Sequence, residues 1–276
     1  MIPDHETNTV YVSDLLQEKY PLVVKAFRRL LGDQLKTIRA TKDIWCRDYM
    51  PIQLGQGRFA QFKYDPDYLG ENPEDRTENG CDLLKLKTCR RSHVVIDGGN
   101  VVRWNDTAIL TDKIYKENPG IERPRLRDRL RRTLEVENLV VIPKEPFDDI
   151  GHSDGMVRFI DEKTLLVNEY LGEGRAFGKR LHNRLRRKGF ELILFPYNPT
   201  DEQGTDPGIP PAVGVYINFL HVGNLIVCPI FGMAEDDNAL RTLKEAFPKA
   251  KIEPLECRAL AMEGGVLNCV TWNVRK

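Results

Sequence analysis

The hydrophobic positions of this chain alternate between short two-strand patterns and longer helical patterns. β-Branched and aromatic residues that flank a Gly, Asn or Asp turn predict hairpins, because those turn residues tolerate the backbone angles of tight turns. Such patterns cover residues 50–62, 101–110, 156–167 and 215–228. Apolar residues at helical spacing predict helices over Ser13–Leu31, Glu122–Glu137, Glu173–Lys188 and Ala234–Phe247. The chain is therefore expected to alternate hairpins with helices.

A short polar sequence accompanies each repeat of this pattern. These polar corners are marked by Asp48, Asp97, His152, Asn218 and Cys269. They recur roughly every 50 to 65 residues, a period typical of repeat architectures whose equivalent corners meet at a common axis. We therefore predict an α/β fold, a five-bladed α/β propeller with pseudo-fivefold repeats of hairpin plus helix, in which residues 1–276 form one domain. An ordinary mixed α/β domain with hairpins alike by chance is the alternative.

Charge and hydropathy favour a small molecule as the partner. The 41 basic and 41 acidic side chains cancel, so no net field favours nucleic acid or an anionic membrane. The arginine-rich segments 123–132 and 179–188 carry leucines on one face, which is typical of a solvated helix rather than a nucleic-acid contact.

No apolar run approaches the ~20 residues that span a bilayer, and no secretory leader is recognisable. We expect a soluble cytoplasmic protein with no membrane partner, and a homodimer is an open possibility.

The cysteines are spaced in a way that argues against two common uses. The six residues include no Cys-x-x-Cys pair, which argues against a zinc ribbon or a thioredoxin-type redox motif. In the reducing cytoplasm that we expect, all of them would stay free thiols.

A cysteine, a histidine and several carboxylates together suit attack on a cationic carbon. A free thiol has a pKa of about 8.5, so at neutral pH it needs a nearby cation to become the thiolate nucleophile. A guanidinium substrate supplies that charge, and its planar fork of N–H donors pairs with carboxylates. Cys269, His152, Asp48 and Asp154 could instead bind a metal, but with only one candidate histidine we predict no metal.

Each corner taken alone has a structural explanation. Cys269 alone is more typical of a buried core residue than of a nucleophile. Arg47 with Asp48 could equally form a buried salt bridge. His152 with Asp154 fits a turn closed by an Asx-type hydrogen bond, and Gly98-Gly99 a bulge where backbones approach closely. The ordered set of corners favours a catalytic site over coincidence.

Five motifs in order resemble the guanidino-group-modifying superfamily, which includes agmatine deiminase, arginine deiminase and the amidinotransferases. The resemblance is closest to agmatine deiminase and the bacterial peptidyl-arginine deiminases, and it covers the chain from about residue 45 to its end. The motifs are Trp45–Pro51, Asp97–Asn100, Gly151–Asp154, Tyr216–Phe219 and the run from Gly264 through Cys269 to Thr271. This resemblance implies the five-bladed pentein fold.

The resemblance also implies catalytic roles. Cys269 would attack the guanidinium carbon and form a covalent thiouronium adduct, which water then releases as a ureido product. His152 would protonate the departing nitrogen and then activate that water. Asp97 stands at the position of the family glutamate that orients the histidine.

Substrate contacts are expected mainly from the first and third corners. Asp48 and Asp154 would hold the guanidinium nitrogens, and Trp45 and Arg47, in the same motif as Asp48, are also expected to bind the substrate. No cofactor is implied. The loops Lys63–Asn72 and Tyr197–Gly214 are expected to form the far end of the pocket.

Two departures from the family lie close to the chemistry. Asn268 replaces the histidine that usually precedes the nucleophile, and Asp97 is one methylene shorter than the family glutamate. Asp97 would reach His152 through a shifted backbone or a water, or would serve the substrate instead. Agmatine, arginine, peptidyl arginine and methylated guanidines therefore stay open as substrates. An amidinotransferase, a methylarginine hydrolase and a non-catalytic binding member of the fold are the alternative functions.

Overall fold

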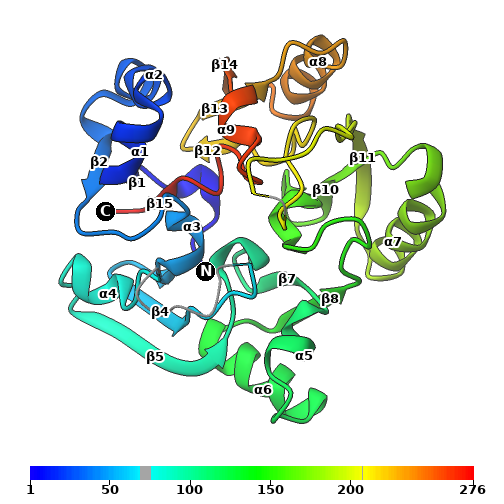
Figure 1. The fold of residues 1–276 in the computed structure, drawn as a ribbon. Coiled ribbons are helices and arrows are strands. Elements are labelled where there is room, and N and C mark those ends of the chain that lie inside the picture. Colours follow the sequence, from blue (N-terminus) through cyan, green and yellow to red (C-terminus); the bar gives the residue numbers. More distant parts are fainter. Residues whose placement is uncertain (69–75, 207) are drawn as a thin grey trace.

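Five three-stranded sheets organise the computed structural model, which describes residues 1–68, 76–206 and 208–276. In each sheet two strands pair antiparallel and a third joins in parallel, and Figure 1 shows the sheets grouped around the middle of the molecule. Within the described residues the sheets are β15-β1-β2 (Trp272–Val274, Thr9–Ser13, Leu35–Ile38), β3-β4-β5 (Ile52–Gly55, Arg58–Lys63, Thr88–Val95), β6-β7-β8 (Val102–Trp104, Thr107–Thr111, Asn138–Ile142), β9-β10-β11 (Val157–Phe159, Thr164–Asn168, Glu191–Phe195) and β12-β13-β14 (Leu220–Val222, Leu225–Ile230, Lys251–Glu256). The predicted five repeats are confirmed.

The two ends of the chain share one sheet. β15 pairs antiparallel with β1, with Thr9 opposite Val274, and β2 then adds to β1 in parallel. This sheet has the same strand arrangement as the other four, although its antiparallel pair joins the beginning of the chain to its end.

Helices connect the second and third strands of each sheet, because a parallel third strand needs a crossover connection. They are α1 and α2 (Asp14–Lys19, Pro21–Leu31), α4 (Gly80–Leu83), α5 and α6 (Lys113–Glu117, Arg123–Leu134), α7 (Arg175–Arg187) and α8 (Asp236–Ala246). Two further helices of the described ranges, α3 (Cys46–Tyr49) and α9 (Arg258–Ala261), each precede the first strand of a sheet.

The predicted helices are confirmed with one correction. The pattern over Ser13–Leu31 is two helices, because Tyr20 precedes Pro21 and leaves the helical conformation. In α6 the leucines 126, 130 and 134 are fully buried. Burial of each leucine side chain contributes about 1.5–3 kcal/mol, which explains why so arginine-rich a helix docks firmly.

The fourth predicted hairpin begins later than expected. Residues 215–218 form a turn, in which the Asn218 N–H donates to the Val215 carbonyl, and β12 starts only at Leu220. The Asn218 carbonyl in turn accepts from the Asn268 N–H. Backbone bonds within the turn and to the C-terminal segment thus replace the sheet ladder that the apolar pattern predicted.

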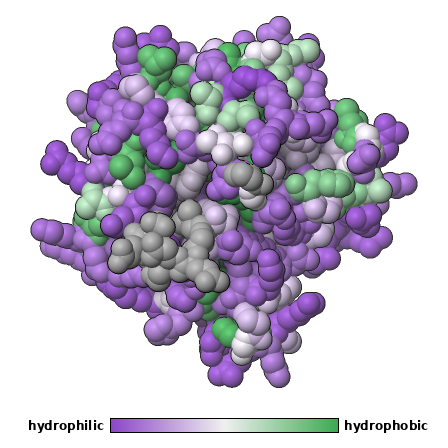
Figure 2. Space-filling view, in the orientation of Figure 1, coloured by the Kyte–Doolittle hydropathy of each residue, from purple (hydrophilic) through white to green (hydrophobic). Residues whose placement is uncertain are grey.

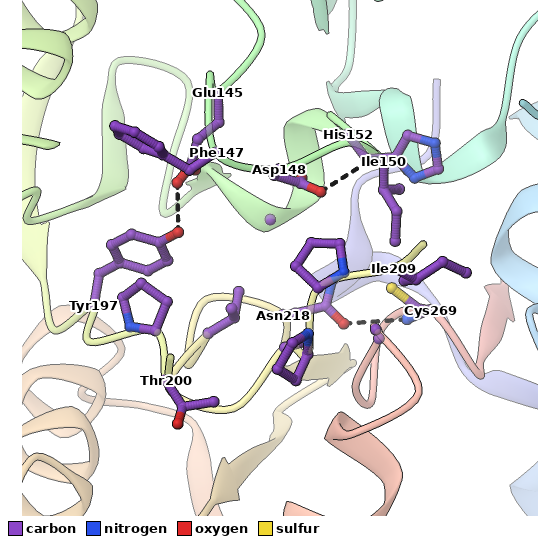
Figure 3. Close-up of a pocket in the computed structure, with 18 of the residues that line it drawn as sticks. Glu145, Phe147, Asp148, Ile150, His152, Tyr197, Thr200, Ile209, Asn218 and Cys269 are labelled. Atoms are coloured by element: carbon purple, nitrogen blue, oxygen red, sulfur yellow. Dashed lines mark hydrogen bonds between the residues drawn. The ribbon is translucent and has the colours of Figure 1, made fainter. Parts of the chain in front are cut away.

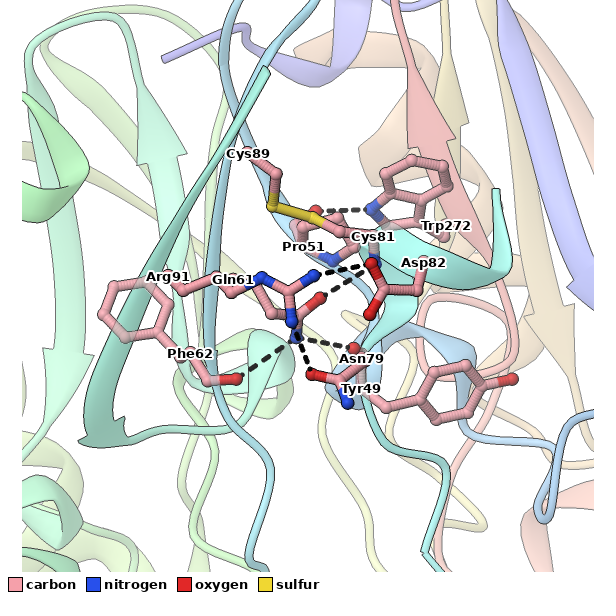
Figure 4. Close-up of a disulfide and its surroundings, with 10 residues drawn as sticks. All are labelled: Tyr49, Pro51, Gln61, Phe62, Asn79, Cys81, Asp82, Cys89, Arg91 and Trp272. Atoms are coloured by element: carbon pink, nitrogen blue, oxygen red, sulfur yellow. Dashed lines mark hydrogen bonds and ion pairs between the residues drawn. A yellow bond between two sulfur atoms is a disulfide. The ribbon is translucent and has the colours of Figure 1, made fainter. Parts of the chain in front are cut away.

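A disulfide joins α4 to β5, which corrects the expectation that all cysteines are free. Cys81 and Cys89 are bonded, with their Cα atoms 6.5 Å apart. Figure 4 shows Arg91 beside this bridge, where it donates to Asn79 and Asp82. The remaining thiols are free: Cys46, Cys228 and Cys257 are buried and Cys269 is half-buried. The sequence could not reveal this pair, because a disulfide depends on the distance between the two cysteines in the folded chain.

The face seen in Figure 2 is mostly hydrophilic, with scattered apolar groups. Among the helices of the described ranges, none combines the length and apolar character needed to cross a bilayer.

Candidate active site

The polar corners of the repeats converge on one cavity of about 670 Å³. Its wall includes Trp45, Asp48, His152, Asp154 and Cys269, so the structure brings together five of the seven residues predicted for the site. Figure 3 shows His152 and Cys269 at the same end of this cavity. Asp97 and Arg47 do not line it; both lie behind its wall.

Close backbone approach holds these corners together. A Cβ atom on Gly98 would lie 2.0 Å from the Arg47 carbonyl oxygen, and one on Gly99 would lie 2.7 Å from both Asp48 Oδ1 and His152 Nδ1. The Gly99 N–H also donates to Asp48 Oδ1 at 2.8 Å. The two glycines therefore allow the contact between corners, so their role is wider than that of a local bulge.

His152 lies between two carboxylates. Its Nε2 is 2.9 Å from Asp97 Oδ2, and its Nδ1 is 3.6 Å from Asp48 Oδ1. Burial opposes the charge on the imidazole, but the Asp48 carboxylate and the bond to Asp97 outweigh it and raise the pKa of His152 to about 9. Burial likewise disfavours an ionised Asp97, yet its bond to His152 and the charge of Lys113 keep the pKa of that carboxyl below its usual value. At neutral pH the pair is an imidazolium and a carboxylate.

The surroundings of Asp48 disfavour its ionised form. Burial, followed by the charges of Asp97 and Asp154, raises the pKa of Asp48 to about 6 against the opposing influence of His152. The Tyr68 hydroxyl donates to its Oδ2 at 2.8 Å. A cation that enters the cavity would favour the ionised form.

Behind Asp97 lies a buried lysine that the sequence did not single out. Lys113 Nζ lies 3.2 Å from Asp97 Oδ2, 3.1 Å from Asp67 Oδ1 and 3.1 Å from Glu117 Oε1. Burial is the main reason that the pKa of Glu117 rises to about 7. In the sequence, Lys113 and Glu117 look like a surface i,i+4 pair, so only the packing of α5 reveals their position.

The Cys269 thiol is half-buried and faces acidic neighbours. Its backbone N–H donates to Asn218 Oδ1 at 3.3 Å, as drawn in Figure 3. Burial, then the charges of Asp154 and Asp48, raise the pKa of Cys269 well above that of a free thiol. The sulfur therefore stays protonated until a cation offsets these carboxylates.

Asn268 links the wall of the cavity to Arg47. Its side-chain oxygen accepts from Arg47 Nη2 at 3.1 Å, and its amide nitrogen donates to Asp154 Oδ2 at 2.6 Å. Arg47 also donates to Asn273 Oδ1 at 2.6 Å. Within the described residues Arg47 forms no salt bridge with Asp48, so the alternative explanation of that motif is not supported.

The end of the cavity away from Cys269 carries Glu145 and Tyr197, as Figure 3 shows. Glu145 accepts hydrogen bonds from Tyr170 at 2.9 Å and Tyr197 at 2.5 Å, and its burial raises its pKa to about 7 despite these bonds. The predicted loop Tyr197–Gly214 contributes to the wall, with residue 207 outside the described residues. Of the other predicted loop, Tyr68 lies in the wall, and residues 69–72 fall outside the described residues.

The described lining of the cavity is acidic. No lysine and no arginine contributes to it, whereas seven acidic residues do: Asp48, Glu145, Asp148, Asp154, Glu173, Asp201 and Glu263. The sequence, with its balanced charge, gave no sign of this local excess. Over the same described ranges, no group of three or more His, Cys, Asp and Glu side chains is arranged to hold a metal ion.

Comparison with known proteins points to one family. A family model described as Porphyromonas-type peptidyl-arginine deiminase matches residues 1–274. The agmatine deiminase of Stutzerimonas stutzeri is 27% identical over 222 residues, which cover 68% of this chain and 60% of that protein, less than two thirds of its length.

Solved structures share the fold. The agmatine deiminase of Enterococcus faecalis superposes with a TM-score of 0.82 at 19% identity, covering 100% of this chain and 95% of that one. The C. jejuni agmatine deiminase gives a TM-score of 0.80 at 16% identity, covering 100% and 95%. These likenesses confirm the fold that the sequence motifs implied.

Proposed function

Because the chain belongs to the Porphyromonas-type peptidyl-arginine deiminase family, we propose that it is a cysteine hydrolase that converts a guanidine into a ureido product and ammonia. One observation carries this proposal. A protonated thiol, an imidazolium and two carboxylates line one acidic cavity whose described wall contains no basic residue other than His152. That combination suits a substrate that brings its own positive charge.

The substrate would activate the nucleophile. Asp48 and Asp154, which raise the pKa of the Cys269 thiol, are neutralised when a guanidinium binds between them. The thiol then loses its proton to solvent, and the thiolate forms a C–S bond to the guanidinium carbon. His152, protonated at neutral pH because its pKa is about 9, donates its proton to the departing nitrogen. The C–N bond breaks, ammonia leaves, and a cationic thiouronium adduct stays on Cys269.

Hydrolysis of the adduct reverses the role of the histidine. His152, now neutral, accepts a proton from water as the oxygen attacks the adduct carbon. The C–S bond breaks, the second proton of that water restores the thiol, and the ureido product leaves. Asp97 would serve as a positioning residue throughout, since it is bonded to the imidazole. Arg47 would likewise act through Asn268 rather than on the substrate.

The acidic wall favours one kind of guanidine. A free carboxylate on the substrate would meet Glu145, Glu173 or Asp201, and the described part of the wall offers no lysine or arginine to pair with it. A guanidine that ends in an ammonium group, such as agmatine, suits the cavity better than free arginine. Agmatine is also the substrate in the names of the related deiminases, which favours hydrolysis over transfer of the amidino group to an amine.

Residues 1–276 are proposed to act as one catalytic domain, because β15 pairs with β1 and corners from along the whole chain line one cavity. The homodimer and the cytoplasmic location stay predictions. Size-exclusion chromatography with light scattering tests the first, and fractionation of cells tests the second.

Activity on a panel of guanidines tests the proposal. Agmatine, arginine, an arginine peptide and a methylarginine are incubated with the protein, and ammonia and ureido products are measured. We expect turnover of agmatine and none with Cys269→Ser. A haloacetamidine should modify Cys269, while Cys46, Cys228 and Cys257 act as internal controls in peptide mass spectrometry. If no guanidine is consumed and Cys269 is not modified, the chain is a non-catalytic member of the fold.

A further inference from the structure

A second, small cavity of about 20 Å³ lies behind the acidic wall. Three arginines from different elements line it: Arg47 of α3, Arg103 of β6 and Arg158 of β9. All three are buried. The exposed fraction is 5% for Arg47, 8% for the Arg103 side chain and 5% for the Arg158 side chain. Three guanidinium groups around one cavity repel one another unless counter-charges lie between them.

One carboxylate from the N-terminal segment serves two of these arginines. Asp4, in the 3-10 turn Asp4–Glu6, lies 3.3 Å from Arg103 Nη2 and 2.7 Å from Arg158 Nη2. Burial disfavours its ionised form, but Arg158 and Arg103 outweigh this and lower the pKa of Asp4. Asp4 is therefore a carboxylate that two guanidinium groups share.

Arg47 has no such partner in the described part of the chain. Its side chain donates to neutral acceptors, namely the carbonyl and side-chain oxygens of Asn268 and the side chain of Asn273, and it forms no ion pair there. A buried guanidinium bonded only to amides retains its full charge, which costs several kcal/mol unless a counter-ion is near.

The remaining charges around this cavity do not balance the arginines. Asp154 also lines it, but the same residue lines the larger acidic cavity, where under the proposed function it would hold the guanidinium. His221 is neutral at pH 7, because burial lowers its pKa to about 4. Among the described residues, the three arginines and the carboxylates of Asp4 and Asp154 leave a surplus of one positive charge at this cavity. The surplus becomes two when Asp154 pairs with a cation bound in the larger cavity.

We propose that this cavity is a binding site for a small monovalent anion of the size of chloride, held among Arg47, Arg103 and Arg158. Its volume suits a single water or a monatomic ion and excludes phosphate or a dicarboxylate. Guanidinium groups present several N–H donors, so an anion can accept from more than one arginine. The anion acts as a structural counter-ion for Arg47, whose side chain fixes the amide of Asn268 against Asp154.

The stack of His5 on Trp104 covers one side of this site. The rings lie 4.6 Å apart, and both residues line the cavity. His5 is exposed, so a shift of this side chain opens a path to solvent.

Bromide in crystals of the wild-type protein tests the proposal directly. Crystals grown in sodium bromide are measured at the bromine absorption edge. We expect an anomalous peak in contact with the guanidinium groups of Arg47 and Arg158. Electron density for water without an anomalous peak, or no density, would overturn the proposal.

A second measurement compares chloride with gluconate at equal ionic strength in thermal unfolding. Chloride is expected to raise Tm above the gluconate value in the wild-type protein and in Arg125→Met, which removes an exposed arginine of α6. Arg158→Met, which keeps a long apolar stem beside the Phe219 ring, should lose this difference or need at least tenfold more chloride. An equal chloride effect in all three proteins contradicts the proposal. If Arg158→Met does not fold, the bromide experiment decides.

Discussion

Asp97 Oδ2 lies 2.9 Å from His152 Nε2, so the aspartate reaches the imidazole directly although its side chain is one methylene shorter than glutamate. Neither an intervening water nor a role on the substrate is needed to explain its presence. Lys113 Nζ lies 3.2 Å from the same oxygen, so His152 belongs to a buried group of alternating negative and positive side chains.

Replacement of this carboxylate should change the pH dependence of activity. His152 has a raised pKa of about 9, so below that pH it is protonated and ready to donate to the departing nitrogen. We expect the wild-type kcat/KM to fall as pH rises through about 9. In Asp97→Asn the pKa of His152 drops, so the falling limb moves to lower pH and kcat declines by about 10²-fold.

The control is a pH profile of the wild-type protein under the same buffers, together with circular dichroism of the variant. An unchanged profile in a folded Asp97→Asn protein would show that Asp97 does not govern the protonation of His152.

Lys113 is expected to stabilise the fold through its three acidic neighbours. In Lys113→Met, the carboxylates of Asp97 and Glu117 lose their buried counter-charge, and the free energy of unfolding should fall by about 3–5 kcal/mol. The double variant Lys113→Met/Glu117→Gln removes one of the two carboxylates left without a counter-charge. It should therefore recover part of the free energy of unfolding that Lys113→Met loses. Urea unfolding of both variants and of Glu117→Gln completes a double-mutant cycle. If the changes in the free energy of unfolding of the two single variants add up to that of the double variant, Lys113 and Glu117 are not coupled.

Asp154 should suppress the reactivity of Cys269 in the free protein. Its charge is the largest contribution after burial to the raised pKa of the thiol. Asp154→Asn is therefore expected to increase the rate of alkylation of Cys269 by iodoacetamide at neutral pH, in the absence of substrate. The same variant should raise KM for agmatine, because one carboxylate partner of the guanidinium is lost.

Opposite changes in alkylation and in kcat/KM distinguish this electrostatic role from general disruption of the site. If alkylation slows along with turnover, the carboxylate holds the geometry of Cys269 instead.

The repeat pattern predicted the architecture and most of the residues that gather at the candidate site, because both follow from local sequence. Hairpin turns, helical spacing and the corners with Asp48, His152 and Cys269 are visible in short stretches. Lys113 and Glu145 escaped prediction, since their significance arises from burial against segments distant in the sequence. Residues 215–218 were wrongly predicted as strand because their apolar side chains pack in the core while their backbone forms a turn.

Gly99 should be intolerant of even one added carbon. A Cβ there would lie 2.7 Å from both Asp48 Oδ1 and His152 Nδ1, so in Gly99→Ala these two groups must move apart. A displacement of about 1 Å at a catalytic group costs on the order of 10²-fold in rate, so we expect kcat to fall by that factor while far-UV circular dichroism stays unchanged. Gly120→Ala is the matched control, because a Cβ at Gly120 meets nothing within 4 Å and should leave kcat unaffected. Full activity in Gly99→Ala would mean that the close approach of the two corners is not required for turnover.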